Sequence, residues 1–270
     1  MIAFAANSLF CRLALGQDLI DAATFTTVRM TSGAVTLGII LLIRGITKVR
    51  FPADWRLVLM LFFYMTFFSF AYLSLSAGTG ALILFGAVQL TMFFVALRGR
   101  EYFPLLSWIG LSLAVLGLVY LVSPGLAAPD PLGAVLMAIA GISWGFYSLL
   151  GRSAPDPLEA TAKNFIYSLP LVLMVNLYFF GTFRSTSTGM VLAIISGAVT
   201  SGIGYVVWYA ALPGLTAARA ATVQLSVPVI AALGGVILLN EDITTRLLIA
   251  SVATLGGVAI VLAQRAVKTP

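Results

Sequence analysis

Apolar residues follow one another along this chain in long stretches and do not alternate with polar ones. The run Leu57–Phe63, for example, contains no polar position, whereas a strand of a membrane β-barrel alternates over about ten residues. Stretches near the roughly 20 residues that a helix needs to cross hydrocarbon recur throughout, and charges, proline or glycine end each of them. The pattern predicts an all-α polytopic membrane protein.

We delimit ten such stretches, joined by connections too short for a soluble domain. They cover residues 1–15, 22–43, 54–76, 79–97, 103–122, 131–151, 160–180, 188–212, 216–239 and 245–264. The first begins at Met1 without a basic flank, as a secretory signal can. Its pattern returns at Trp144, where no signal peptide can lie, so we interpret it as a membrane helix, and a clipped start would account for its shortness.

The second half of the chain repeats features of the first. Phe4, Asn7, Phe10 and Arg12 correspond in type and spacing to Trp144, Tyr147, Leu150 and Arg152; Val88–Leu90 corresponds to Val223–Leu225, and Ala114–Gly117 to Ala253–Gly256. Each unit holds five predicted helices, an odd number, so the second unit enters the membrane upside down. We predict two inverted five-helix repeats, residues 1–125 and 126–270, that form one membrane domain around a central cavity, an arrangement typical of transporters.

Composition and charge agree with this interpretation. The chain is 61% hydrophobic and 9% charged, against about 25% charged in soluble proteins. If the amino terminus is cytoplasmic, most basic residues fall on the cytoplasmic side: Arg44, Lys48, Arg50, Arg56, Arg98, Arg100, Arg152, Arg219, Arg265 and Lys268. Arg184 and Arg246 fall on the opposite side, with Arg12 near its edge. The positive-inside rule then predicts that both termini are cytoplasmic, and the net charge of +6 needs no nucleic-acid partner.

Several functions lack the residues they require. With one cysteine and no histidine, we expect no metal site, no cofactor and no catalytic residues. A membrane-embedded lipid enzyme stays a remote alternative. A structural subunit without transport is a third reading, whose sign would be a solidly packed core. No Asp or Glu lies in the middle third of a predicted helix, which disfavours proton coupling through a buried carboxylate.

Polar and aromatic residues inside the predicted helices are the candidates for the cavity lining. Pro228 frees the carbonyl group of Gln224 within a predicted helix, and Gln89 is the repeat counterpart of Gln224. The predicted substrate-binding residues are Asn7, Tyr72, Gln89, Trp144, Tyr147, Tyr205, Trp208 and Gln224, and the predicted hinges are Pro170 and Pro228. For Tyr205 and Trp208 the alternative is the aromatic belt at the membrane surface. Aromatic faces with a few amides suit a neutral or zwitterionic organic molecule.

Two basic residues, Arg29 and Lys163, lie inside helical stretches. We expect long basic side chains at this depth to snorkel or to cap a neighbouring helix, and binding of a substrate carboxylate is the alternative. If both faced one cavity, exchange of sugar phosphates or nucleotide sugars would be favoured. Arg12 and Arg152, at helix ends, are interpreted as orientation anchors.

The chain resembles the EamA-type branch of the drug/metabolite transporter superfamily in three features. These are the first-helix pattern with its copy, the Asp21–Phe25–Arg29 start of the second helix, and the stretch from Pro228 to Glu241. A weaker copy of the last stretch ends at Glu101. Phe4 stands where that family usually has Trp, and Asn240 stands where Gly often precedes the Glu.

Within this branch the chain is similar to YddG-type exporters. The resemblance implies a transporter in the bacterial inner membrane that exports neutral, and in particular aromatic, amino acids and their analogues by alternating access. Another small-molecule substrate, such as an organic cation, is the alternative. Because one chain carries both repeats, we expect it to work as a monomer in the lipid bilayer.

Overall fold

The computed structural model describes residues 1–46, 54–98, 103–125, 127–152, 154, 156–211 and 223–266, except the side chains of Arg265 and Ala266. Six residues of the charge and motif predictions lie outside these ranges: Lys48, Arg50, Arg100, Glu101, Arg219 and Lys268. The described residues are almost all helical, and their only β pairing is an isolated bridge between Ile20 and Ser185. The all-α class is confirmed.

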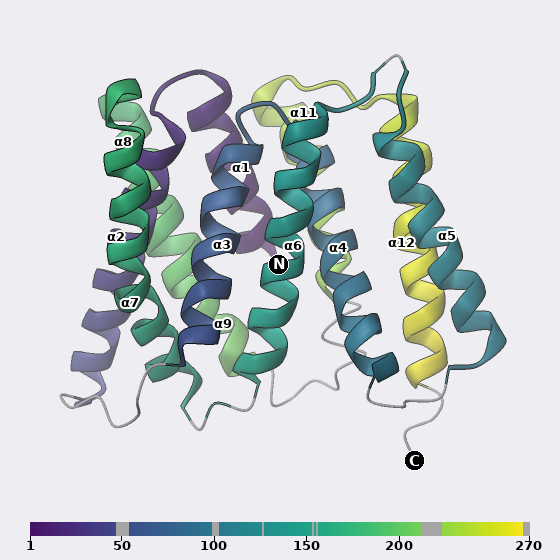
Figure 1. Cartoon of the computed structure of the whole chain (residues 1–270), viewed down its shortest axis with the longest axis horizontal. Helices are drawn as coiled ribbons and strands as arrows, with labels where there is room; N and C mark the ends of the chain where they lie inside the picture. Colours follow the sequence, from purple (N-terminus) through teal and green to yellow (C-terminus); the bar gives the residue numbers. More distant parts are fainter. Residues whose placement is uncertain are drawn as a thin grey trace.

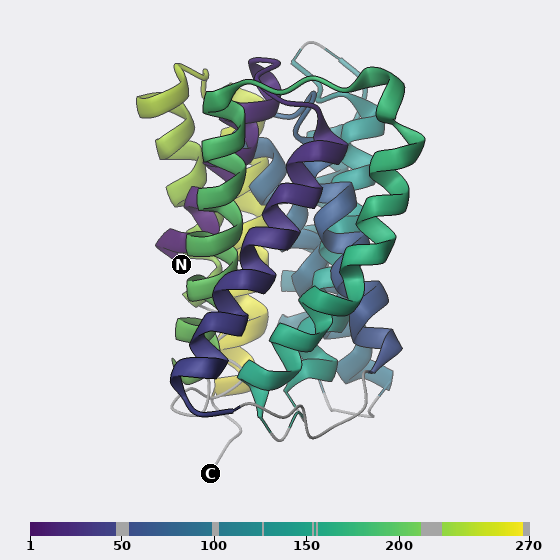
Figure 2. The ribbon, with the colours of Figure 1, turned by 90° about the vertical axis from the view of Figure 1, so that its left-hand side faces the viewer.

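The helices run side by side along one direction (Figures 1 and 2). They are α1 (Ile2–Gly16), α2 (Ala22–Ile43), α3 (Trp55–Ala71), α4 (Ala77–Arg98), α5 (Leu105–Val122), α6 (Pro131–Gly151), α7 (Pro157–Tyr178), a short 3₁₀ turn η1 (Phe180–Thr182), α8 (Ser187–Ile195), the π-helical η2 (Ser196–Ile203), α9 (Gly204–Ala211), α11 (Ser226–Leu239) and α12 (Thr245–Ala266). Six are long and apolar enough to cross a membrane, counting Ser187–Ala211 as one span. The number of ten spans and the inverted repeat stay predictions.

Short polar residues set where several helices begin. Asp21, Asp54, Asp130 and Asp156 each accept a backbone N–H of the helix that follows, the usual role of an N-cap. Because Asp156 caps α7 and Pro157 follows it, α7 begins three residues before the predicted start at 160. Glu159 is thereby part of the helix.

The proline predictions have different outcomes. Pro170 lies inside α7, which continues through it. Pro228 was predicted in mid-helix, but α11 begins at Ser226, so this proline lies in the first turn, where a missing N–H breaks no helical hydrogen bond. The hinge roles of both prolines stay predictions.

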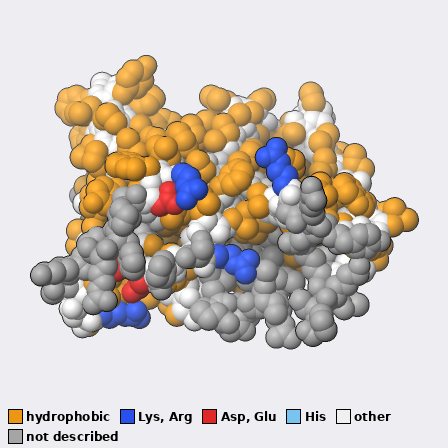
Figure 3. Space-filling view, turned by 60° about the horizontal axis from the view of Figure 1, so that its bottom comes forward, with side chains coloured by type: hydrophobic (Ala, Val, Ile, Leu, Met, Phe, Trp, Pro, Cys, Tyr) orange, Lys and Arg blue, Asp and Glu red, His pale blue; other side chains and the backbone are white. Residues whose placement is uncertain are grey.

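The outside of the bundle is apolar. Leu105, Leu177 and Val252 are each more than two-thirds exposed, and hydrophobic side chains make up most of the described surface in Figure 3. A soluble protein rarely exposes apolar patches of this extent. The surface is suited to lipid, as expected of a multi-pass membrane protein.

Charged residues gather at the two ends of the bundle. Arg44 and Arg152 follow α2 and α6, and Arg98 ends α4, at the lower end in Figure 1. Arg56 lies in the first turn of α3 at the same end. Arg12 lies at the upper end. This segregation agrees with the predicted topology, but Met1 is at mid-height (Figure 1), so the side of the amino terminus stays a prediction.

Small residues let helix backbones approach closely, as the Gly141/Gly145 and Gly197/Ser201 spacings predict. A Cβ atom at Gly141 would lie 2.5 Å from the carbonyl oxygen of Leu84 on α4. A Cβ atom at Gly197 would collide with the carbonyl oxygen of Arg29 on α2. The helices α2 and η2 are therefore in backbone contact at the depth of Arg29.

Candidate functional site

Aromatic rings from several helices meet in one cluster inside the bundle. Trp144 of α6 is at its centre: the ring centroid is 4.8 Å from that of Tyr64 on α3, 5.1 Å from Tyr205 on α9, 5.6 Å from Tyr147 and 5.9 Å from Phe4 on α1. All five rings are buried. The cluster contains residues from both halves of the chain.

Tyr205 and Trp208 belong to this cluster. Their ring centroids each lie 6.0 Å from that of Phe4, and their exposed fractions are 1% and 8%. The interfacial-belt alternative is therefore wrong for both residues, since their rings point into the bundle.

Asn7 and Tyr147, at corresponding places in the repeat, both bind neighbouring helices. The Oδ1 atom of Asn7 accepts hydrogen bonds from Ser196 Oγ at 2.7 Å and from Thr200 Oγ1 at 3.1 Å, both on η2. The hydroxyl of Tyr147 accepts one from Asn164 Nδ2 of α7 at 3.3 Å. π-Helical segments are rare in proteins, and those that occur are often found at functional sites. The segment η2 faces this part of the bundle.

Arg29 does not snorkel, and that expectation is wrong. Its side chain is fully buried, and its Nε donates to Ser201 Oγ at 3.1 Å and its Nη2 to the Tyr64 hydroxyl at 3.4 Å. The guanidinium carbon lies 4.9 Å from the ring centroid of Phe68 and 5.6 Å from that of Tyr64, in cation–π range. Its Nη1 has no hydrogen-bond partner.

Lys163 does not snorkel either. Its Nζ lies 2.9 Å from Glu159 Oε1, and the two side chains are 5% and 4% exposed. Glu159 was absent from the predicted segment because that segment began at residue 160. The charge of Lys163 is therefore balanced by its own helix.

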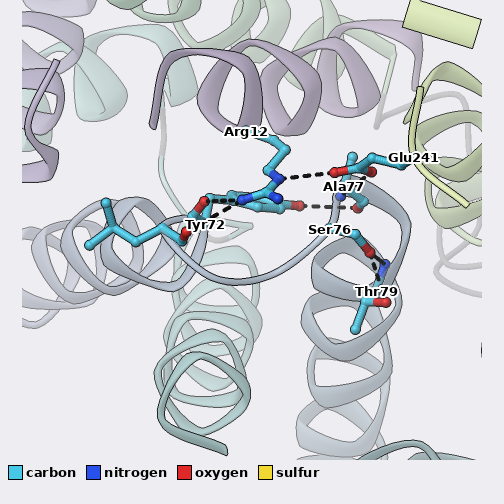
Figure 4. A network of polar contacts seen from close by, with 7 residues as sticks. Arg12, Tyr72, Ser76, Ala77, Thr79 and Glu241 are labelled. Carbon is cyan, nitrogen blue, oxygen red and sulfur yellow. Dashed lines mark hydrogen bonds and ion pairs between the residues drawn. The ribbon is translucent and has the colours of Figure 1, made fainter. Parts of the chain in front are cut away.

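Tyr72 lies at the edge of the cluster and connects it to a polar network at the upper end (Figure 4). Its ring centroid is 4.8 Å from that of Phe68, and its carbonyl oxygen accepts from Arg12 Nη1 at 3.2 Å. Arg12 Nε also binds Glu241 Oε1 at 2.9 Å, and Ala77 N donates to Glu241 Oε2 at 2.8 Å. The network thus joins α1, the α3–α4 connection and Glu241, which lies just after the end of α11.

Gln89 and Gln224 are buried. Gln89 Nε2 and Gln224 Oε1 lack a hydrogen-bond partner within the described structure. Their predicted contact with substrate stays a prediction.

A pocket of about 210 Å³ lies near the polar network, where the α3–α4 connection meets the start of α12. Its lining includes Ser76, Thr79, Asp242 and Thr244. The central cavity among the aromatic rings stays a prediction. Among the described residues, no three His, Cys, Asp or Glu side chains are grouped as a metal site requires.

Sequence reasoning did not single out Tyr64, Phe165 and Asn164. Tyr64 lies four residues before Phe68, so both rings share one face of α3, which is a signal that could have found it. Phe165, whose ring centroid is 5.8 Å from that of Tyr205, carries no such signal.

Comparisons with known proteins identify the family. Residues 131–263 match the model of the EamA-like transporter family. A Pseudomonas aeruginosa protein called "Uncharacterized protein PA1977" is 48% identical over 265 residues, which cover 98% of this chain and 92% of that one. An Archaeoglobus fulgidus protein called "Uncharacterized transporter" is 28% identical over 211 residues, 75% of this chain and 74% of the relative. The chain belongs to the EamA-like transporter family.

A solved structure supports the fold of this EamA-like transporter. A crystal structure with 20% sequence identity superposes with a TM-score of 0.69 and covers 97% of this chain and 96% of its own. The resemblance to the EamA-type branch of the drug/metabolite transporter superfamily is confirmed. The family and the transporter-named relative point to a membrane transporter rather than an enzyme.

Proposed function

We propose that this EamA-like transporter exports neutral, and in particular aromatic, amino acids from the bacterial cytoplasm across the inner membrane. The observation that carries the proposal is the aromatic cluster around Trp144, which both halves of the chain build and which includes one buried cation, Arg29. Ring faces attract aromatic and apolar side chains. One cation matches one carboxylate.

We infer that the route is alternating access between two inverted five-helix repeats, with ten spans and cytoplasmic termini. Helix packing supports this symmetry. The predicted symmetry pairs the helices as follows: α1 with α6, α2 with α7, α3 with the Ser187–Ala211 span, α4 with α11, and α5 with α12. When the members of each pair are exchanged, the contact of α3 with α6 becomes that of α1 with η2, and the contact of α4 with α6 becomes that of α1 with α11. All four contacts are present in the structure. The pairs α2–α7, α4–α11 and α5–α12 are unchanged by the exchange.

The sugar-phosphate alternative required Arg29 and Lys163 to serve one site. Lys163 is balanced by Glu159, so its charge is already neutralised. A multiply charged substrate would have to break this pair in a buried environment, which is costly. A singly charged carboxylate group is the better match.

Counterflow into liposomes tests the proposal. Purified protein is reconstituted into liposomes loaded with unlabelled phenylalanine, and uptake of labelled phenylalanine or tryptophan is compared with that of protein-free liposomes. We expect faster uptake that unlabelled aromatic amino acids compete away. The variant Trp144→Ala is expected to change the order of preference among amino acids, because it removes the central ring. Uptake equal to protein-free liposomes over a broad amino-acid panel would reject the proposal.

A further inference from the structure

We propose that Arg29 and Tyr205 together bind the carboxylate group of the transported molecule. The inference deepens the proposed function and rests on it in part, because it assumes that the cluster around Trp144 receives a solute. The new element is how the solute is held: its carboxylate group is bound by one donor from each half of the chain.

The first step is the unbalanced charge of Arg29. A guanidinium stays charged in proteins, and this one is fully buried. Within the described part of the chain, its nitrogens bind only the neutral hydroxyls of Ser201 and Tyr64, and its Nη1 has no partner. Buried charges in a membrane normally pair with an opposite charge or mark a substrate pathway.

The second step is the contrast with other cations of the same bundle. Arg12 has Glu241 at 2.9 Å, and Lys163 has Glu159 at 2.9 Å. Both of these cations have a carboxylate from the chain itself. Arg29 is more deeply buried than either, yet no ion pair is found for it among the described residues, so a carboxylate from outside the chain fits its site.

The third step is a second unpartnered donor beside the first. The hydroxyl of Tyr205 is buried and makes no hydrogen bond with the described residues. Tyr205 lies four residues after Ser201, whose hydroxyl accepts from Arg29 Nε, and the Trp144 ring contacts both the Tyr205 ring and the ring of Tyr64, the other hydroxyl partner of Arg29. A carboxylate has two oxygens and accepts hydrogen bonds at both. One oxygen can take Arg29 Nη1 and the other the Tyr205 hydroxyl, which satisfies both buried groups.

The surroundings define the rest of the molecule. The Tyr205 ring contacts Phe4 and Trp144, with centroids 6.0 and 5.1 Å away. An apolar or aromatic body next to the carboxylate would face these rings. A dianionic phosphate would bring two negative charges to a site where Arg29 can balance one. An amine without a carboxylate would be repelled by the positive charge of Arg29.

A ligand series isolates the carboxylate. Purified protein is mixed with phenylalanine, 3-phenylpropionate, phenylalaninamide or phenethylamine, and binding is measured as a shift of the thermal unfolding temperature and as competition in counterflow. Phenylalanine and 3-phenylpropionate, which keep the carboxylate, are expected to raise the unfolding temperature. Phenylalaninamide and phenethylamine, which lack it, are expected to leave it unchanged.

Paired variants locate the effect in the two donors. Arg29→Gln is expected to weaken phenylalanine binding at least ~100-fold, as loss of one partner of a buried ion pair does. Arg29→Lys, which keeps the charge but not the planar fork, is expected to lie between Arg29→Gln and the wild type. Tyr205→Phe is expected to weaken binding roughly tenfold or more, as loss of a hydrogen bond to a charged group does.

Two control variants make the same chemical changes elsewhere. Arg184→Gln removes a largely exposed guanidinium, and Tyr167→Phe removes a hydroxyl from an exposed ring. Both are expected to bind phenylalanine as the wild type does. Tyr205→Phe should also unfold much like the wild type without ligand, because its hydroxyl makes no hydrogen bond with the described residues.

The outcomes separate this inference from the proposed function. Transport of phenylalaninamide and phenethylamine at the rate of phenylalanine would overturn the carboxylate site and leave amino-acid export standing. Binding of 3-phenylpropionate that Arg29→Gln abolishes, without transport of any amino acid, would support the site and reject the proposed function. If no aromatic or aliphatic carboxylate binds, or if Arg29→Gln and Arg29→Lys both fail to fold while Tyr205→Phe binds normally, the inference is overturned.

Discussion

The helices α2 and α7 pack against each other, and each buries a basic residue about two turns from its beginning. On α7, Lys163 is paired with Glu159 four residues earlier, at 2.9 Å. On α2, the hydrogen bonds and ring contacts found for the Arg29 guanidinium among the described residues are with hydroxyls and ring faces. Two positions that look alike in the sequence therefore differ in whether the chain supplies the opposite charge.

This difference separates a structural charge from a functional one. In a buried ion pair each charge is already balanced, so a third charged group adds little stability. Removing one partner leaves the other charge buried without compensation. A buried cation with only neutral partners is favourable mainly when something else brings the counter-charge. The comparison supports a scaffold role for Lys163 and the carboxylate site that we propose for Arg29.

The largest expected effect comes from breaking the pair on α7. Glu159→Gln leaves the charge of Lys163 buried, and the free energy of unfolding should fall by about 3–5 kcal/mol. Arg29→Met removes a charge that has no carboxylate partner, so the unfolding free energy without ligand should stay unchanged or rise. Unfolding of both variants in mixed micelles with increasing denaturing detergent measures the difference.

The double variant Glu159→Gln/Lys163→Met is the control for this prediction. It removes both charges and should recover much of the stability that Glu159→Gln loses. If Arg29→Met loses as much stability as Glu159→Gln, the two cations have the same structural role and the comparison fails.

A smaller effect is expected where α2 contacts η2. Gly197→Ala places a methyl group against the backbone of Arg29 and the Ser32 hydroxyl, and overpacking of this kind costs about 1–3 kcal/mol. It should also weaken carboxylate binding, because Ser201 moves away from Arg29. Gly38→Ala, whose added Cβ meets nothing within 4 Å, is the matched control on α2 and should not destabilise. Equal stability of the two variants would show that α2 and η2 are not held at backbone distance.

The smallest effect concerns a side-chain hydrogen bond between α2 and α7, which are also joined by Thr27 Oγ1 donating to the Val172 carbonyl oxygen at 3.4 Å. Asn176 Nδ2 donates to Thr24 Oγ1 at 3.2 Å. Hydrogen bonds between membrane helices average about 0.6 kcal/mol, so Asn176→Ala should lower the unfolding free energy by about that amount. A double-mutant cycle with Thr24→Ala checks the value. A coupling near zero would mean that the Asn176–Thr24 hydrogen bond does not help to hold the two helices together.

Hydropathy predicted the helices well where charged or capping residues mark both ends. The predicted limits 22–43 and 131–151 are those of α2 and α6. Segment 54–76 was too long, since α3 ends at Ala71 and the apolar residues after it form a turn. The π-helical η2 is invisible to hydropathy, because its small residues are as apolar as those of an α-helix.

The aromatic part of the site was predictable, and its charged part was not. Trp144 and Tyr147 were chosen because the repeat places them with Phe4 and Asn7, and they do lie in the cluster. The burial of Arg29 depends on which helices surround it, since the same side chain reaches water wherever a neighbour is absent. Sequence spacing within α2 contains no such information.

The missing side chain at Gly197 has a mechanical consequence. At this spacing, sliding α2 past η2 would bring larger side chains against the facing backbone, so we expect the two helices to move together. Although Arg29 is encoded in the first half of the chain, any rocking motion would carry it along with the second. If the predicted repeats rock against each other, the moving bodies would thus not coincide with residues 1–125 and 126–270.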